Sequence, residues 1–249
     1  MHHDLIVIGS GPAGRRAAIQ AAKLGRRALV VDKGRRLGGV SVHTGTIPSK
    51  TLRETVLNLS GWRERGFYGR AYRVKKDISA RDLVKRLHIT LNHEVEVLEH
   101  QFARNRVESL MGAARFLDPH TVEVTAEGGE CLKLTADRFV LAVGTRPHRP
   151  ADIPFDGEKI LDSDEILDIG ALPRNLAVIG AGVIGVEYAT IFSALDVPVT
   201  LVEPRDTMLD FLDRELVQEF THDLRDRGIA LRFGTRVQAI ERADGGCTV

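Results

Sequence analysis

Residues 5–14 read LIVIGSGPAG and residues 176–185 read LAVIGAGVIG, so one short pattern occurs twice at a constant offset of 171 residues. Each copy joins a run of apolar residues to a G-x-G-x-x-G sequence. An acidic residue, Asp32 or Glu203, follows 23 residues after the first glycine of its copy. An internal repeat of this kind indicates two supersecondary units of the same type.

Each part of the repeated pattern has a physical role. The apolar run suits a parallel strand that is buried on both faces. The first glycine permits a tight turn, the second leaves bare backbone beside a pyrophosphate, and the third lets the next helix pack on the strand. The amino end of that helix attracts phosphates, and the acid accepts hydrogen bonds from an adenosine ribose. One such match is weak support, but two matches in the same context predict two dinucleotide sites; the alternative is two buried turns without a ligand.

Composition and charge restrict the other classes of function. The 249 residues are 43% apolar and 28% charged with a net charge of +1, which predicts no nucleic-acid binding by bulk electrostatics. No apolar run approaches the roughly 20 residues that span a bilayer, and no signal peptide precedes the strand at residues 5–8, so we expect a cytoplasmic protein without a membrane partner. Two cysteines predict no disulfide framework, and His2 and His3 without partner ligands predict no metal site.

The segment that follows the first copy carries a resemblance to a known family. Residues 38–50, GGVSVHTGTIPSK, resemble the G-G-x-C-x-x-x-G-C-x-P-S-K sequence of the FAD-dependent pyridine nucleotide–disulfide oxidoreductases. Ser41 and Thr46 stand at the two cysteine positions, and neither hydroxyl can form a disulfide. Cys131 and Cys247 do not replace them, because both lie in segments that read as ordinary strands.

The sequence GTIPSK, with Thr46 in place of the second cysteine, resembles the soluble pyridine nucleotide transhydrogenases, a branch of that family that uses no dithiol. Residues 46–54, 114–122, 162–167 and 205–213 also resemble this branch, so the resemblance covers essentially the whole chain. Ser41 departs from the branch, which often keeps a cysteine there.

The resemblance implies that the first repeat unit binds FAD. Lys50 would lie near flavin N5, where an ammonium favours the reduced flavin; the alternative is a solvated lysine at a helix start. The residues expected to contact FAD are Gly9, Gly11, Pro12, Ala13, Gly14, Asp32, Lys33, Gly38, Gly39, Ser41, Gly45, Thr46, Ala113, Ala142, Gly144 and Thr145.

The second unit would then bind NAD or NADP. Family members pair the acid at Glu187 with the lysine near N5; the alternative is an acid in the first turn of a helix, stabilised by the helix dipole. Glu203 favours the free 2′-hydroxyl of NAD, whereas Arg205 offers a partner for the 2′-phosphate of NADP or forms a surface ion pair with Asp206. The expected nicotinamide nucleotide contacts are Gly180, Ala181, Gly182, Val183, Ile184, Gly185 and Glu203.

We therefore predict an α/β fold with two Rossmann-like dinucleotide-binding domains and a β-meander insertion. Residues 1–150 would form the FAD-binding domain and residues 151–249 an incomplete NAD(P)-binding domain. The G-D segment and the dimer-interface domain of the family would be absent, as in a truncated chain. Expected helices cover 51–62 and 78–105; expected strands cover 110–113, 121–124, 132–135 and 139–142 in the meander, then 175–180, 197–203, 229–233 and 237–241.

The predicted function is hydride transfer between NADPH and NAD through FAD, without a redox disulfide. Its partners would be nicotinamide nucleotides, and full-length members of the family form homodimers. Two alternatives stay open: a catalytically silent nucleotide-binding fragment, and a relative of dihydrolipoamide dehydrogenase, against which Ser41 and Thr46 argue.

Overall fold

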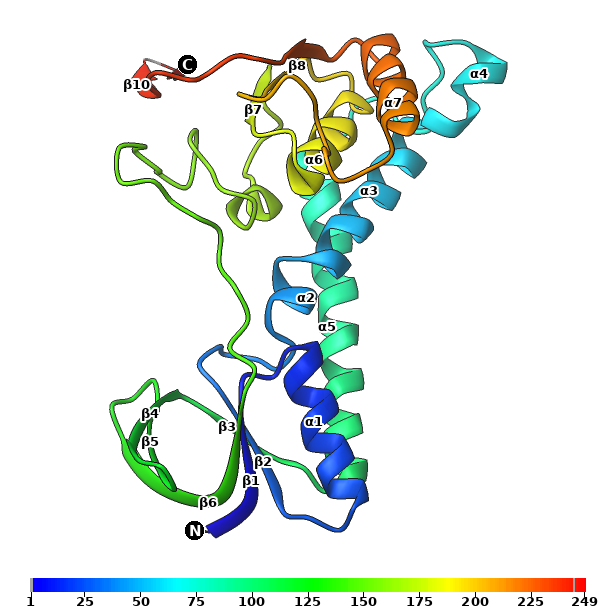
Figure 1. The fold of residues 1–249 in the computed structure, drawn as a ribbon. Helices are drawn as coiled ribbons and strands as arrows, with labels where there is room; N and C mark the ends of the chain where they lie inside the picture. The colour runs from blue at the N-terminus through cyan, green and yellow to red at the C-terminus, as the bar shows by residue number, and fades with distance from the viewer. Residues whose placement is uncertain (1, 244) are drawn as a thin grey trace. The chain divides into compact units, whose positions relative to one another are not determined.

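Strand β1 (His2–Ile8) lies in the middle of a six-stranded sheet, with parallel neighbours on both sides. The computed structural model describes residues 2–243 and 245–249, and this sheet belongs to a first unit that runs to Pro48 and resumes over His88–Arg146. Figure 1 shows the strands of this sheet with helix α1 (Pro12–Lys23) beside them. The strand order is β3 (Glu108–Met111), β2 (Ala28–Asp32), β1, β6 (Cys131–Leu141), β5 (Thr121–Thr125) and β4 (Ala113–Asp118).

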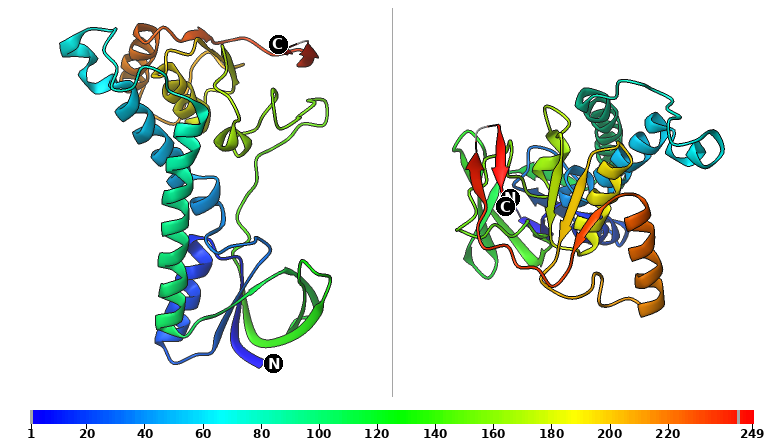
Figure 2. Two further views of the ribbon diagram at one scale, coloured as in Figure 1. Left: turned by 180° about the vertical axis from the view of Figure 1, so that it is seen from behind. Right: turned by 90° about the horizontal axis from the view of Figure 1, so that it is seen from above.

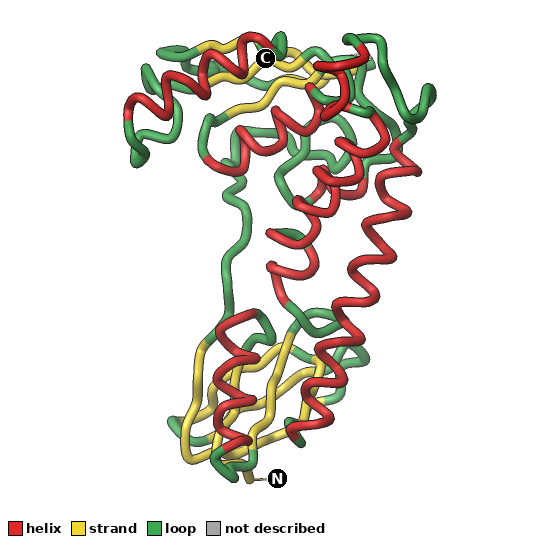
Figure 3. The backbone as a smooth tube through the Cα atoms, turned by 90° about the vertical axis from the view of Figure 1, so that its right-hand side faces the viewer, coloured by secondary structure: helices red, strands yellow, loops and turns green. Residues whose placement is uncertain are grey.

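The apolar strand of the first copy, β1, is buried on both faces of this sheet, as its run of apolar residues predicts. The expectation is wrong for the second copy, whose apolar run at residues 176–179 is partly exposed, with Ile179 45% exposed. Ile6 packs on one face with Leu29 and Val31, and Val7 packs on the other face with Ala18 of α1 and Val30. Figure 3 shows the helices along one face of the strands. Parallel pairing of β1 with β2, and of β2 with β3, gives the βαβ arrangement of a Rossmann-like fold.

The meander differs from the prediction in two ways. Residues 132–135 and 139–142 were expected as separate strands, but β6 is continuous because no glycine or proline interrupts it and it pairs with β1 on one edge and β5 on the other. The expected strand 110–113 divides between β3, which is a parallel strand beside β2, and the start of β4. The inserted meander therefore consists of β4, β5 and β6 only.

The chain between β2 and β3 is mainly helical. The predicted helix 51–62 begins five residues earlier, since proline is tolerated in the first turn and Pro48 lies there. The predicted helix 78–105 is confirmed within two residues, with Leu83, Leu87 and Leu98 buried along one side. These elements are α2 (Gly39–His43), α3 (Thr46–Ser60), η1 (Trp62–Glu64), α4 (Arg65–Tyr68) and α5 (Ala80–Asn105).

The second unit, Ser49–Leu87 with Pro147–Val249, contains a three-stranded parallel sheet in the order β7, β8, β9. Figure 2 shows these strands and helices from two further directions. The predicted strands 175–180, 197–203 and 229–233 are present, but 237–241 is irregular until β10, which pairs with β11 in a short hairpin. The elements are η2 (Glu165–Asp168), β7 (Leu176–Ile179), α6 (Val183–Ser193), β8 (Val199–Val202), α7 (Arg214–Asp226), β9 (Ala230–Arg232), β10 (Glu241–Ala243) and β11 (Gly246–Thr248).

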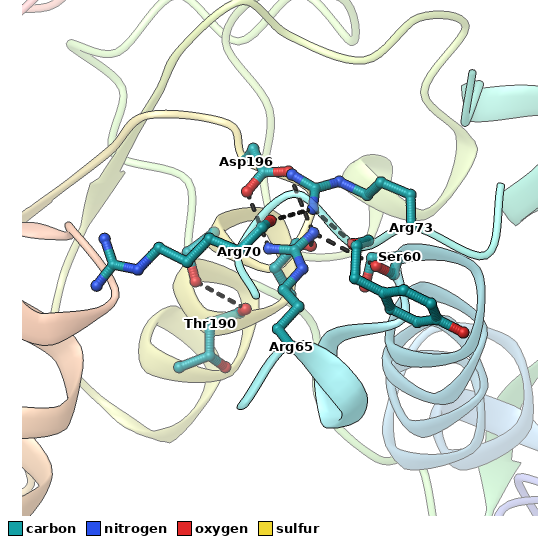
Figure 4. A network of polar contacts seen from close by, with 9 residues as sticks. Ser60, Arg65, Arg70, Arg73, Thr190 and Asp196 are labelled. Carbon is teal, nitrogen blue, oxygen red and sulfur yellow. Dashed lines mark hydrogen bonds and ion pairs between the residues drawn. The ribbon is translucent and has the colours of Figure 1, made fainter. Parts of the chain in front are cut away.

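A polar network joins the segment after α3 to the turn after α6 within the second unit (Figure 4). Asp196, which has a left-handed backbone with φ +62°, accepts from both Arg65 and Arg73. The Arg65 side chain is only 9% exposed and its guanidinium stacks over Trp62, 4.8 Å from the ring centre. A buried guanidinium requires such a carboxylate partner, so Asp196 fixes where α3 and its following turn pack on α6.

No helix in residues 2–243 and 245–249 has the length and the apolar character that crossing a bilayer requires. The same residues contain no cluster of three or more histidine, cysteine, aspartate or glutamate side chains suited to a metal ion.

Candidate nucleotide-binding turns

The first glycine turn connects β1 to α1. Gly9 has φ +107°, and a Cβ there would lie 2.1 Å from the carbonyl oxygen of Ala142. A Cβ on Gly14 would lie 1.9 Å from the oxygen of Gly9, so this position sets how closely the helix packs on the turn. A Cβ on Gly11 would meet nothing within 4 Å, although Gly11 is the N-cap residue of α1. The backbone at Gly11 is therefore open at the amino end of this helix, where phosphates bind favourably.

Asp32 supports this turn from the end of β2. Its Oδ2 accepts from the backbone N–H of Ser10 at 2.6 Å, and its Oδ1 accepts from that of Gly34 at 2.8 Å. Each carboxylate oxygen has a second lone pair, which leaves Asp32 able to accept from a ribose hydroxyl as well. The acid thus positions the glycine turn in addition to its predicted ribose contact.

The loop at residues 38–39 packs directly on the first turn. The Gly38 N–H donates to the hydroxyl of buried Ser10 at 2.8 Å, and a Cβ on Gly39 would lie 3.0 Å from Cα of Gly11. The sequence motif includes both glycines, but the contact of Gly38 with Ser10 was not predicted. The only feature of the motif that relates to this contact is the small hydroxyl side chain of Ser10 inside the glycine turn.

The second glycine turn has the same construction between β7 and α6. Gly180 has φ +103°, and a Cβ on Gly185 would lie 2.0 Å from the oxygen of Gly180. Gly182 is the N-cap residue of α6, and a Cβ there would again meet nothing within 4 Å. The N-terminal residues of α6, Val183 and Ile184, are exposed, whereas Ala181 is buried.

Glu203 supports the second turn as Asp32 supports the first. Its Oε2 accepts from the backbone N–H of Ala181 at 2.8 Å, and Ala181 is the repeat counterpart of Ser10. Its Oε1 accepts from Nε of Arg205 at 2.8 Å and from the Arg205 backbone N–H at 3.1 Å. The bond from Arg205, opposed by burial and assisted by the two backbone donors, lowers the pKa of Glu203 from 4.5 to about 2.

Arg205 bridges two carboxylates. Besides Glu203, it donates through Nη1 to Oδ2 of Asp210 at 2.8 Å, and the bonds to Glu203 and then Asp210 raise its already high pKa further. The sequence offered Asp206 as the ion-pair partner, but the structure gives Arg205 the carboxylates of Glu203 and Asp210. Asp210 was not predicted as a site residue, because nothing in the sequence indicates how the loop after β8 folds back.

Ser41 and Thr46 lie on either side of the break between α2 and α3. The Ser41 hydroxyl donates to the carbonyl of Gly38 at 3.4 Å, and Thr46 is the first residue of α3. Cys131 and Cys247 are exposed and carry free thiols. The segment therefore has the backbone of the motif without its sulfur atoms.

Lys50, in α3, forms an ion pair with Glu187 in the first turns of α6. The Glu187 side chain is 17% exposed and that of Lys50 is 59% exposed. Both residues belong to the second unit. The two residues predicted as catalytic thus contact each other, while the Lys50 side chain remains largely solvent-exposed.

The remaining predicted residues occupy ends of elements. Lys33 directly follows β2, and Gly45 directly precedes α3. Gly144, with φ +68°, and Thr145 follow β6 together with Ala142. The others are Pro12 and Ala13 at the start of α1, and Ala113 at the start of β4.

Comparison with known proteins assigns the chain to a family. A family model described as pyridine nucleotide-disulphide oxidoreductase matches residues 3–249. Proteins named soluble pyridine nucleotide transhydrogenase from Mycobacterium tuberculosis and Pseudomonas fluorescens are 50% and 42% identical over 245 residues, 98% of this chain. The chain spans about half the length of these relatives, 52% and 53% respectively.

Solved structures agree with this assignment. The crystal structure of LpdA from Mycobacterium tuberculosis has a TM-score of 0.88 at 28% identity, with 98% of this chain and 54% of that chain covered. The HOCl-induced flavoprotein disulfide reductase RclA from Escherichia coli has a TM-score of 0.82 at 24% identity, with 98% and 52% covered, and shows the fold alone. The repeated glycine turns, the matched family model and these relatives together show that the chain belongs to the pyridine nucleotide–disulphide oxidoreductase family.

Proposed function

We propose that the chain binds FAD at the first glycine turn and a nicotinamide nucleotide at the second. The protein to which it belongs would transfer hydride between NADPH and NAD without a redox disulfide. The observation that carries this proposal is the open space beside Gly11 and Gly182, each at the amino end of a helix and each braced by an acid. When bound, FAD supplies the two-electron chemistry of hydride transfer.

The first unit provides the groups that would hold FAD. The free N–H groups of α1 would bind the pyrophosphate, because Gly11 leaves the backbone accessible there. Asp32 would accept from the adenosine ribose while it holds the turn through Ser10. The further contacts that we propose are those expected from the sequence: Pro12, Ala13, Lys33, Gly38, Gly39, Ser41, Gly45, Thr46, Ala113, Ala142, Gly144 and Thr145.

Lys50 and Glu187 are the proposed catalytic residues. The Lys50 ammonium would stabilise the negative charge of a reduced flavin, and Glu187 would hold that ammonium in one position. Lys50 lies one helical turn after Thr46 in α3, so the two would face the same side of that helix.

The absence of sulfur at Ser41 and Thr46 determines where the electrons go. A hydroxyl cannot accept them, so no disulfide substrate would be reduced through this segment. The net reaction NADPH + NAD⁺ → NADP⁺ + NADH balances without a released proton, and it needs no general acid or base.

The second unit would bind the nicotinamide nucleotides through residues 180–185 and Glu203. The division into an FAD domain at 1–150 and an NAD(P) domain at 151–249 is part of this proposal. So are the cytoplasmic location and the homodimer of the full-length protein.

The test uses the purified chain incubated with FAD and freed of excess cofactor. We expect one bound flavin, loss of its visible absorbance on anaerobic addition of NADPH, and recovery of the absorbance when NAD is added. A bound flavin that NADPH does not bleach would contradict the proposed reaction. A colourless protein that binds only NAD would favour the catalytically silent fragment.

The dihydrolipoamide dehydrogenase alternative has its own control. The protein should not reduce lipoamide, whereas the double variant Ser41→Cys/Thr46→Cys restores the two thiol positions. Lipoamide reduction by the unaltered chain would contradict the disulfide-free reaction.

A further inference from the structure

The loop after β8 places a second carboxylate, that of Asp210, on Arg205, the residue that would accept the 2′-phosphate of NADP. Arg205 lies between Glu203 and Asp210, with its Nε and Nη2 toward Glu203 and its Nη1 toward Asp210. The Glu203 side chain is 4% exposed, whereas those of Arg205 and Asp210 are 48% and 51% exposed. The three side chains therefore form a chain of contacts that runs from the buried end of β8 to solvent.

Arg205 uses its Nε and Nη2 edge for Glu203 and one N–H of Nη1, on its outer edge, for Asp210. A guanidinium binds a 2′-phosphate through two adjacent N–H groups, as in its pairing with a carboxylate. The outer edge of Arg205, which faces solvent, is the edge that Asp210 holds. A phosphate that binds this outer edge through both Nη atoms would compete with Asp210 for Nη1, whereas the hydroxyl of NAD needs only Glu203.

The charges point in the same direction. Glu203 and Asp210 contribute two negative charges against one positive charge on Arg205, so the group carries one net negative charge. A 2′-phosphate of about −1.5 to −2 charge would be repelled by such a group more than by the Glu203–Arg205 pair alone.

We propose that Asp210 is a specificity-determining residue that keeps Arg205 on Glu203 and thereby weakens the binding of 2′-phosphorylated coenzyme. It acts through Arg205 and not by touching the coenzyme, so it is a positioning residue. The inference rests on the proposed binding of a nicotinamide nucleotide at the second glycine turn. NADP binding accordingly requires Arg205 to exchange the Asp210 carboxylate for the phosphate.

The test measures the dissociation constants of NAD⁺ and NADP⁺ for the intact 249-residue protein by calorimetry. Asp210→Asn should tighten NADP⁺ binding by about threefold to fivefold, the effect of one exposed charge contact, and leave NAD⁺ binding within about twofold. The matched control is Asp206→Asn. It removes one negative charge from the residue next to Arg205 but leaves both ion-pair partners of Arg205, Glu203 and Asp210, in place. Asp210→Glu, which keeps the carboxylate, should retain the original ratio of the two constants.

A second pair of variants shows whether the effect passes through Arg205. Arg205→Gln should weaken NADP⁺ binding, and Asp210→Asn should have no further effect in the Arg205→Gln background. The inference is overturned if Asp206→Asn and Asp210→Asn change the ratio equally, or if the gain persists without Arg205. If neither NAD⁺ nor NADP⁺ binds to the unaltered protein, the proposed nucleotide site itself is wrong. If both coenzymes bind but Asp210→Asn leaves the ratio of their dissociation constants unchanged, only the role of Asp210 is wrong.

Discussion

The two glycine turns share one construction but differ at the acid that braces them. In the first turn, Asp32 accepts from two backbone N–H groups, those of Ser10 and Gly34. In the second turn, Glu203 accepts from the corresponding backbone N–H groups of Ala181 and Arg205 and, in addition, from the guanidinium of Arg205. The shared bonds to backbone N–H groups hold the turn, whereas the additional guanidinium would change the charge that a bound ribose meets. The acids therefore shape the turns, and Arg205 is the residue proposed to influence the choice of ligand.

The largest expected effect comes from the third glycine of each copy. Gly14→Ala and Gly185→Ala would place a Cβ within 2.0 Å of a backbone carbonyl, which cannot move without displacing the turn. Alanine gains helix propensity at such a site, but we expect the clash to lower the free energy of unfolding by about 3 kcal/mol. Urea unfolding measures this change, and unaltered stability would contradict the close packing of helix on turn.

The second glycine of each copy should behave in the opposite way. Gly11→Ala and Gly182→Ala put a Cβ into open space, so we expect stability to change by less than about 1 kcal/mol. The same Cβ would obstruct a pyrophosphate, and we expect dinucleotide affinity to fall by about tenfold or more at the altered turn only. Calorimetric titration with FAD and with NAD⁺ distinguishes the two turns. Equal loss of both ligands in either variant would argue against separate sites.

The lowered pKa of Glu203 makes the stability of the second turn testable by pH. The pKa of Glu203 is lower in the folded chain, so its contribution to stability is full above pH 4.5 and is lost as the pH falls toward 2. Glu203→Gln removes that contribution and should lower the free energy of unfolding by about 1–2 kcal/mol at pH 7, with a smaller difference at pH 3. Urea unfolding at the two pH values measures it. A deficit that stays constant or grows on acidification would contradict the role of the ion pair.

The smallest stability effect is expected at Lys50 and Glu187. The lysine is more than half exposed, so Lys50→Gln and Glu187→Gln should each cost less than about 1 kcal/mol. If the pair serves catalysis, the rate of flavin reduction by NADPH should fall by about tenfold in both variants. Stopped-flow absorbance measures that rate, with Lys75→Gln as a control in another exposed ion pair. Unchanged reduction rates would leave the pair with a structural role only.

The sequence predicted the elements that depend on a local pattern. Both glycine turns, an acid at the end of the second strand of each copy and the long amphipathic helix α5 follow from glycine spacing and from apolar periodicity, and all are present. The bonds by which these acids brace the turns were not predicted. The pairing of Lys50 with Glu187 came only from the family resemblance, since 137 residues separate them.

The parts that could not be predicted depend on contacts distant from the pattern. Residues 132–135 and 139–142 were predicted as separate strands, yet β6 is continuous because residues 131–135 pair with β5 and residues 135–141 pair with β1. The Arg205–Asp210 contact lies in an irregular loop, and no periodic pattern of apolar residues in the sequence indicates how such a loop folds. Long-range pairing and loop geometry therefore account for the differences between prediction and structure.

The pairing of β1 with β6 also has a consequence for how the protein is made. His2 lies opposite Thr135, so β1 cannot gain its second neighbour until more than 130 further residues have been synthesised. Contacts of such large sequence separation slow folding, because a long loop must close before the strands can pair. A nascent chain from which β6 has not yet emerged would expose one edge of β1, and that edge is open to chaperone binding or aggregation.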